Sequence, residues 1–325
     1  MLIALGHVDD KIFDMVLPNL NFALKSFRIP MYFFLSGLFF KTYAGFGDFL
    51  RRKVNNLLIT LLFFHLFSFL LRIPLVWGIH NIRPDLEIPF SWTYVLPSFM
   101  GGEWKSAGAL WFLLALFMVN IIFYILHQHL KRFLYLSVLL LSIAGYLLMS
   151  NKTGQILYLD VALVALPYFA LGFFVRKSNL LAPSKYDKYG PIVMIPSIFF
   201  IYYFSKDINF LYRIVPDYLS LYLIPFVAIL SLFWCCKNLG YVPVICYYGR
   251  YSIVILGTHQ ILISYIWFAL LGIFGIHYLT LSITTYVTLM IAELFVIPVM
   301  ITHFPRFTAQ SDFFCTNWKL NNSGE

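Results

Sequence analysis

Charged residues are scarce in this chain. They make up only 11% of its 325 residues, whereas 61% are hydrophobic. Soluble domains are about a quarter charged and about half apolar, so this composition excludes an ordinary water-soluble core. The chain also lacks a polar stretch long enough to fold as a separate domain. It is therefore predicted to be an all-α, polytopic membrane protein in contact with membrane lipid.

Cysteine is also infrequent, and its spacing excludes two kinds of site. The four cysteines include the adjacent pair Cys235 and Cys236, which fits neither a disulfide framework nor a metal site. His127 and His129 lack further ligands at a usable spacing, so we expect no metal. The net charge of +9 comes from basic residues scattered between apolar runs. Loops of membrane proteins have this pattern, and we expect no nucleic-acid partner.

The apolar runs predict a bundle of about ten transmembrane helices, since about 20 mostly apolar residues cross the hydrocarbon. The first, at residues 1–8, is expected to be a helix truncated at its N-terminus. Residues 1–303 would form one transmembrane domain, followed by a polar cytoplasmic tail at 304–325. The remaining helices are expected at residues 22–43, 54–77, 108–127, 133–149, 156–175, 191–204, 218–234, 251–274 and 279–303.

Lysine and arginine are distributed unevenly between the two sets of loops. The loops after the second, fourth, sixth and eighth predicted helices, together with the tail, hold most of them. Cytoplasmic loops carry such an excess. We therefore predict a multi-pass protein whose C-terminus is cytoplasmic.

Several ionisable side chains fall inside the predicted helices, where inserting a charge costs about 2.5–3.5 kcal/mol. His65 lies in the middle of the third helix, and His259 and Glu293 lie deep in the last two. A buried histidine can simply hydrogen-bond a neighbouring helix. Glu293 could pair with a histidine or with Arg72, or stay protonated. These residues have both a structural and a functional interpretation, and they would also suit a proton-coupled carrier.

The stretch Ser26–Lys41 combines a basic residue, a proline, a block of aromatic residues and two small residues. Ser36 and Gly37 interrupt the bulky side chains and would let another helix approach closely, as small residues do in membranes. No histidine lies near Ser36 in the sequence. We therefore expect Ser36 to serve helix packing in preference to acting as a nucleophile.

Five separated stretches together resemble the membrane acyltransferase 3 family. They occur in the family's order and span nearly the whole chain. The stretches are LGHV around His7, FRIPMYFFLSGLFF at 27–40, GALWFLLALF at 108–117, YYGRYSIVILGTHQ at 247–260 and IPVMITHFPRFTAQ at 297–310.

The resemblance implies an integral-membrane acyltransferase of the plasma (inner) membrane. Such proteins move an acyl group, usually acetyl, from cytoplasmic acyl-CoA to a hydroxyl of a cell-surface polysaccharide or a lipid-linked glycan precursor. Acyl-CoA would be a co-substrate, and no permanently bound cofactor is expected. Two features depart from the family pattern. The charged residues upstream of the first histidine are absent because the chain begins too late, and the Arg-x-x-Arg spacing is not kept.

The resemblance places the family's helix-1 histidine at His7 and its basic motif at Arg51, Arg52 and Lys53. The pKa of histidine suits a general base for the acceptor hydroxyl. Guanidinium and ammonium groups suit the phosphates of CoA, although cytoplasmic topology alone would also explain them. Arg28 could polarise the thioester carbonyl or hold the acceptor, or it could anchor its helix at the interface.

Other residues are second-rank candidates for the site. Trp111 would pack in the core or stack on a sugar or adenine. The others in this group are Ser36, Ser252, His259 and Glu293. Since His7 and the basic cluster lie toward opposite faces, the hypothesis requires a polar tunnel between them. Two alternatives remain open: a transporter or flippase for a glycan-related or small-molecule substrate, and a non-catalytic subunit of a glycan-assembly complex.

Overall fold

The computed structural model describes residues 18–82, 90–96, 108–152, 156–269 and 278–310. Within these ranges the regular structure is helical, apart from one isolated antiparallel bridge between Asn209 and Ile214. Six of the described helices are long and apolar enough to cross a membrane. These findings confirm the prediction of an all-α, polytopic membrane protein. The truncated first helix lies outside the described residues.

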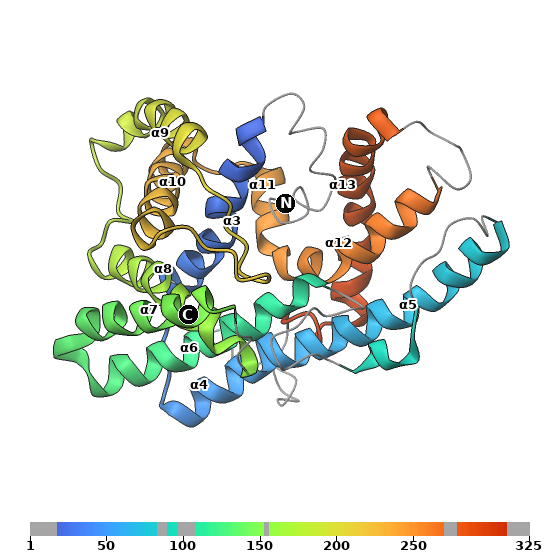
Figure 1. The fold of residues 1–325 in the computed structure, drawn as a ribbon, viewed down its shortest axis with the longest axis horizontal. Coiled ribbons are helices and arrows are strands. Elements are labelled where there is room, and N and C mark those ends of the chain that lie inside the picture. Colours follow the sequence, from blue (N-terminus) through green and yellow to red (C-terminus); the bar gives the residue numbers. More distant parts are fainter. Residues whose placement is uncertain (1–17, 83–89, 97–107, 153–155, 270–277, 311–325) are drawn as a thin grey trace.

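The described helices are arranged along the chain as Figure 1 shows. They are α3 (Pro18–Leu38), α4 (Phe46–Lys53), α5 (Thr60–Ile82), α6 (Trp111–His129), α7 (Leu134–Ser150), α8 (Leu159–Lys177), α9 (Gly190–Phe204), α10 (Tyr218–Leu239), α11 (Pro243–Arg250), α12 (Ser252–Trp267) and α13 (Tyr278–His303).

Several helical segments differ from the sequence-based expectation. The helix predicted at 22–43 ends at Leu38, and the one predicted at 218–234 continues to Leu239. The third predicted helix begins earlier, because α4, a π-helical segment at Val54–Ile59 and α5 run on as one helix from Phe46 to Ile82. The basic cluster therefore lies on a helix and not in a loop. The short helix α11 was not expected, although Pro243 at its first turn is a recognised start signal.

The close contact between α3 and α8 organises one half of the molecule. A Cβ atom built on Gly37 would lie 1.9 Å from the carbonyl oxygen of Phe169, and one built on Gly172 would lie 2.0 Å from that of Phe34. Only glycine permits the two backbones to approach this closely. This contact confirms the expectation that the Ser36-Gly37 pair lets another helix approach.

The helices form two groups that meet at α6 (Figure 1). In the first group α3 and α8 contact each other, α7 packs on α8, and α9 and α10 pack on α3. In the second group α12 packs against both α5 and α13. Here a Cβ atom on Gly257 would lie 2.2 Å from the ring of Phe64, so α12 and α5 are also in close contact.

A buried ion pair ties a loop to the start of α8. The Nε atom of Arg213, in the loop at 205–217, donates to Oδ2 of Asp160 at 2.7 Å. Asp160 is fully buried and Arg213 is only 7% exposed. A pair with so little access to water holds its loop firmly, since separating the charges would leave each one buried alone.

The chain just beyond α13 returns to α5. The rings of Phe304 and Phe307 lie 5.2 and 4.9 Å from that of Phe63. Thr308 is fully buried there. This contact fixes the described start of the tail against the helix that carries the basic cluster.

Candidate functional site

Three of the five family-like stretches meet inside the bundle. Phe112 of the stretch at 108–117 packs against Tyr32 and Phe33 of the stretch at 27–40, with ring centroids 5.8 and 5.1 Å apart. The side chain of Gln260, in the stretch at 247–260, accepts a hydrogen bond of 3.0 Å from the backbone N–H of Ala109. Segments far apart in the sequence therefore share one interior region, bounded by α3, α6 and α12.

On α3, the predicted site residues Arg28 and Ser36 lie about two helical turns apart. Arg28 is half-buried, one turn before Tyr32. The Ser36 hydroxyl accepts a 3.4 Å hydrogen bond from Nδ2 of Asn120, which also donates to the Leu116 carbonyl at 2.7 Å. Because Asn120 is fully buried on α6, it joins the two helices through Ser36. This geometry supports a packing role for Ser36.

Trp111 begins α6 and is almost entirely buried, at 6% exposure. Its ring lies 6.3 Å from that of Phe112 and 5.6 Å from that of Tyr158, which is also fully buried. Trp111 therefore packs in the core, as one of its two interpretations predicted. Its ring contacts that of Phe112, which in turn packs against Tyr32, one helical turn from Arg28. Stacking of Trp111 on a ligand would require these rings to separate.

His259 and Glu293 are fully buried on adjacent helices. Nδ1 of His259 donates to the carbonyl of Ile255 at 2.8 Å. The neighbouring Thr258 hydroxyl donates to Oε1 of Glu293 at 2.7 Å. Glu293 thus has a threonine as its hydrogen-bond partner, and not a histidine or Arg72 as considered from the sequence.

The second oxygen of Glu293 distinguishes this carboxyl group from ordinary packing. Oε2 is buried and, within the described ranges, has no hydrogen-bond partner. Buried polar atoms are rarely left in this state, and each one calls for an explanation.

Ser252, by contrast, begins α12 and is partly exposed, and it is not joined to this cluster. His65, on α5, donates from Nε2 to the carbonyl of Val95 at 3.1 Å, which fits a structural role.

The basic cluster occupies the last turn of α4. Arg51 and Arg52 are exposed and Lys53 is half-buried. Arg52 pairs with Asp48 at 3.2 Å, and its guanidinium lies 4.7 Å from the ring centroid of Tyr43. These contacts orient Arg52 while leaving it accessible, as a phosphate-binding side chain needs to be.

The π-helical segment begins immediately after this cluster. Asn55, at its second position, is buried at 3% exposure, and its Nδ2 donates to Oδ1 of Asn56 at 2.8 Å. Asparagines therefore stand where the family pattern has its second arginine. Single π-helical turns within α-helices are frequent at functional sites.

His7 lies outside the described residues, so its distance from Arg51–Lys53 and the predicted polar tunnel stay predictions. Sequence reasoning overlooked two polar residues of the interior, Asp160 and Asn120. Asp160 is the single acidic residue in the predicted helix at 156–175. A complete survey of ionisable residues within apolar segments would have found it.

Two cavities lie apart from the residues predicted for the site. A groove of about 510 Å³ lies between α7, α8 and α10. A second cavity of about 530 Å³ lies between the ends of α8 and α10, beside the ion pair of Asp187 with Lys237 at 2.9 Å. The hydrogen bond from Lys237 lowers the pKa of Asp187. None of the predicted site residues lines either cavity.

Comparison with known proteins identifies the class of this chain. It matches one protein family, described as an acyltransferase domain, over residues 1–302. The match covers all but the tail, so the chain belongs to the acyltransferase 3 family and is a membrane acyltransferase. This confirms the resemblance in the five stretches. Searches among curated proteins and among solved structures gave no match.

Proposed function

We propose that this membrane acyltransferase transfers an acyl group from cytoplasmic acyl-CoA to a hydroxyl of a cell-surface polysaccharide or lipid-linked glycan precursor. The acyl group we propose is acetyl. Membership of the acyltransferase 3 family over residues 1–302 carries the proposal. The meeting of three family-like stretches around α3, α6 and α12 supports it, because it supplies a shared interior for the reaction.

In the proposed reaction His7 acts as the general base. It takes the proton of the acceptor hydroxyl while the oxygen attacks the thioester carbonyl. The tetrahedral intermediate carries a negative charge on the former carbonyl oxygen, and Arg28 is positioned in this scheme to stabilise that charge. Collapse breaks the carbon–sulfur bond. The departing thiolate of CoA takes up the proton from His7, and the ester remains on the acceptor.

The basic cluster on α4 would hold the phosphates of CoA. Arg51 and Arg52 are exposed at one end of the long helix, and Asp48 and Tyr43 orient Arg52. A planar guanidinium forms paired hydrogen bonds with phosphate oxygens. These residues bind the donor in this scheme and do not take part in bond breaking.

The test is transfer of radiolabelled acetyl from acetyl-CoA by the purified full chain, compared with His7→Ala. Loss of the general base is expected to lower the rate about a hundredfold or more. His80→Ala is the matched control, because His80 is exposed at the end of α5, and it is expected to keep the wild-type rate.

The outcomes separate the proposed activity from its alternatives. A wild-type chain that neither hydrolyses nor transfers from any acyl-CoA would contradict the proposal and favour a carrier or an assembly subunit. An active chain whose rate survives His7→Ala would keep the reaction but remove His7 as its base.

A further inference from the structure

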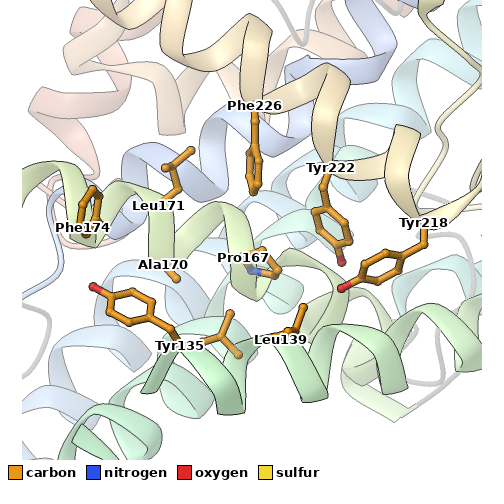
Figure 2. Close-up of a pocket in the computed structure, with 10 residues that line it drawn as sticks. Tyr135, Leu139, Pro167, Ala170, Leu171, Phe174, Tyr218, Tyr222 and Phe226 are labelled. Atoms are coloured by element: carbon orange, nitrogen blue, oxygen red, sulfur yellow. The ribbon is translucent and has the colours of Figure 1, made fainter. Parts of the chain in front are cut away.

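The groove between α7, α8 and α10 is lined almost entirely by carbon (Figure 2). Pro167 and Ala170 form its floor on α8, and larger side chains of α7 and α10 form its walls. Proline and alanine fill less space than the surrounding aromatic and leucine side chains. A depression about 510 Å³ in volume therefore follows the helices.

Two of the three tyrosine hydroxyl groups along this groove are already used within the protein. The Tyr218 hydroxyl lies 2.7 Å from the Ser142 hydroxyl, and the Tyr222 hydroxyl donates to the Val164 carbonyl at 3.0 Å. These two tyrosines therefore present their ring faces and not their hydroxyl groups to an occupant. The groove suits a hydrocarbon chain better than a sugar or a nucleotide.

One end of the groove is basic. Tyr135 and Phe174 meet there, with ring centroids 6.3 Å apart. Lys131 precedes Tyr135 by four residues and Lys177 follows Phe174 by three, so the backbone of each lysine lies about one helical turn beyond these rings. The charges of both lysines act electrostatically on His127, in the last turn of α6.

The charges at this end are not neutralised by any carboxylate that the structure describes. Lys131, Arg132 and Lys177 are exposed, and no carboxylate in the described ranges forms an ion pair with any of them. The guanidinium of Arg132 lies 5.9 Å from the ring centroid of Phe133. Three exposed cations near this end of the groove are therefore available to a partner of negative charge.

We propose that this groove binds an anionic glycerophospholipid. Its acyl chain lies along α8 between α7 and α10, and its phosphate is held by Lys131, Arg132 and Lys177. The charge complementarity of the basic end selects an anionic headgroup, and the apolar groove selects a chain. This is a lipid site apart from the proposed acyl transfer, and it does not depend on that activity.

The test is native mass spectrometry of the purified full chain in detergent, titrated with phosphatidylglycerol or with phosphatidylcholine of the same acyl chains. Each basic residue near an anionic headgroup contributes about fivefold in affinity. The triple variant Lys131→Ala/Arg132→Ala/Lys177→Ala is expected to weaken binding of phosphatidylglycerol on the order of a hundredfold. It is expected to weaken binding of phosphatidylcholine far less, because the choline cation offsets the charge of the phosphate.

A matched control is available on another exposed basic loop. Lys185→Ala/Lys188→Ala removes two exposed cations that do not border the groove and is expected to bind phosphatidylglycerol as the wild type does. Ala170→Phe fills the floor of the groove and is expected to reduce binding of both lipids. The triple variant alters only exposed side chains, so it decides the question even if Ala170→Phe does not fold.

Three results would overturn the proposal. Equal binding of the two lipids by the wild type would show that the headgroup is not recognised. Unchanged binding of phosphatidylglycerol by the triple variant would place the lipid elsewhere. The third result is displacement of phosphatidylglycerol by millimolar inorganic phosphate, together with an affinity that does not depend on the acyl chains of the lipid. It would show that the basic end binds a free anion and not a lipid.

Discussion

At the scale of single residues, the interior of this protein holds polar groups in defined partnerships. Asn120 joins α6 to α3 through Ser36, and Thr258 joins α12 to α13 through Glu293. Such hydrogen bonds replace the contacts with water that a membrane cannot supply. Glu293 and Asp160 each keep one buried carboxyl oxygen without a described partner, but among the described residues only Asp160 of the two is paired with a cation, Arg213.

The ion pair of Asp160 with Arg213 yields a prediction at this scale. Asp160→Asn keeps the shape of the side chain but leaves the Arg213 cation buried opposite a neutral amide. We expect a loss of about 3–5 kcal/mol in the free energy of unfolding, since a buried charge loses its counter-ion. Thermal or denaturant unfolding of the purified protein in detergent would measure it.

The control for this variant lies in the same loop. Lys206 pairs with Asp217, but both side chains are about half exposed, at 53% and 52%. Lys206→Ala is therefore expected to cost about 0–1 kcal/mol. Similar losses in the two variants would contradict the view that burial makes the Asp160 pair important.

At the scale of helices, the contact between α3 and α8 depends on two glycines that face each other's backbones. Gly37→Ala would place a methyl group 1.9 Å from the Phe169 carbonyl oxygen. A backbone atom cannot move aside as a flexible side chain can, so the helices must separate. We expect a loss of roughly 1–3 kcal/mol in the free energy of unfolding, measured by the unfolding midpoint in detergent.

Gly47 provides a matched substitution on α4. A Cβ atom there would meet nothing within 4 Å. Gly47→Ala is expected to be neutral or to stabilise the helix by up to about 1 kcal/mol. If Gly37→Ala were tolerated as well as Gly47→Ala, α3 and α8 would not be in backbone contact.

At the scale of the whole molecule, the lengths of the apolar runs in the sequence predicted most of the helices. They did not predict how the helices associate. The ends of α6, α7, α9 and α13 lie close to the predicted ones because long apolar runs define them. By contrast, the extension of the third predicted helix back through α4 was not predicted, because the charged residues Asp48, Arg51, Arg52 and Lys53 interrupt the apolar run there. The pairing of Asp160 with Arg213 joins distant parts of the chain. Periodicity along one segment cannot show such contacts.

Orientation in the membrane is the remaining prediction of the whole molecule, and α10 offers a direct test. Its 22 residues span about 33 Å, enough to cross the hydrocarbon. Lys206 pairs with Asp217 at the N-terminal end of α10, and Lys237 pairs with Asp187 at its C-terminal end. Lys185, two residues from Asp187, therefore lies toward the end opposite Lys206. The positive-inside rule predicts that the Lys185 end is cytoplasmic.

Single cysteines at these two positions, in a chain whose own cysteines are replaced by serine, would report the orientation. A membrane-impermeant maleimide is expected to label Lys206→Cys in intact cells, and Lys185→Cys only after the membrane is opened. The reverse pattern would put the loops rich in lysine and arginine outside. Arg51, Arg52 and Lys53, on α4, are predicted to lie on the same side of the membrane as these loops. They would then face away from cytoplasmic acyl-CoA, and the proposed donor site would have to be abandoned even if acyl transfer itself were demonstrated.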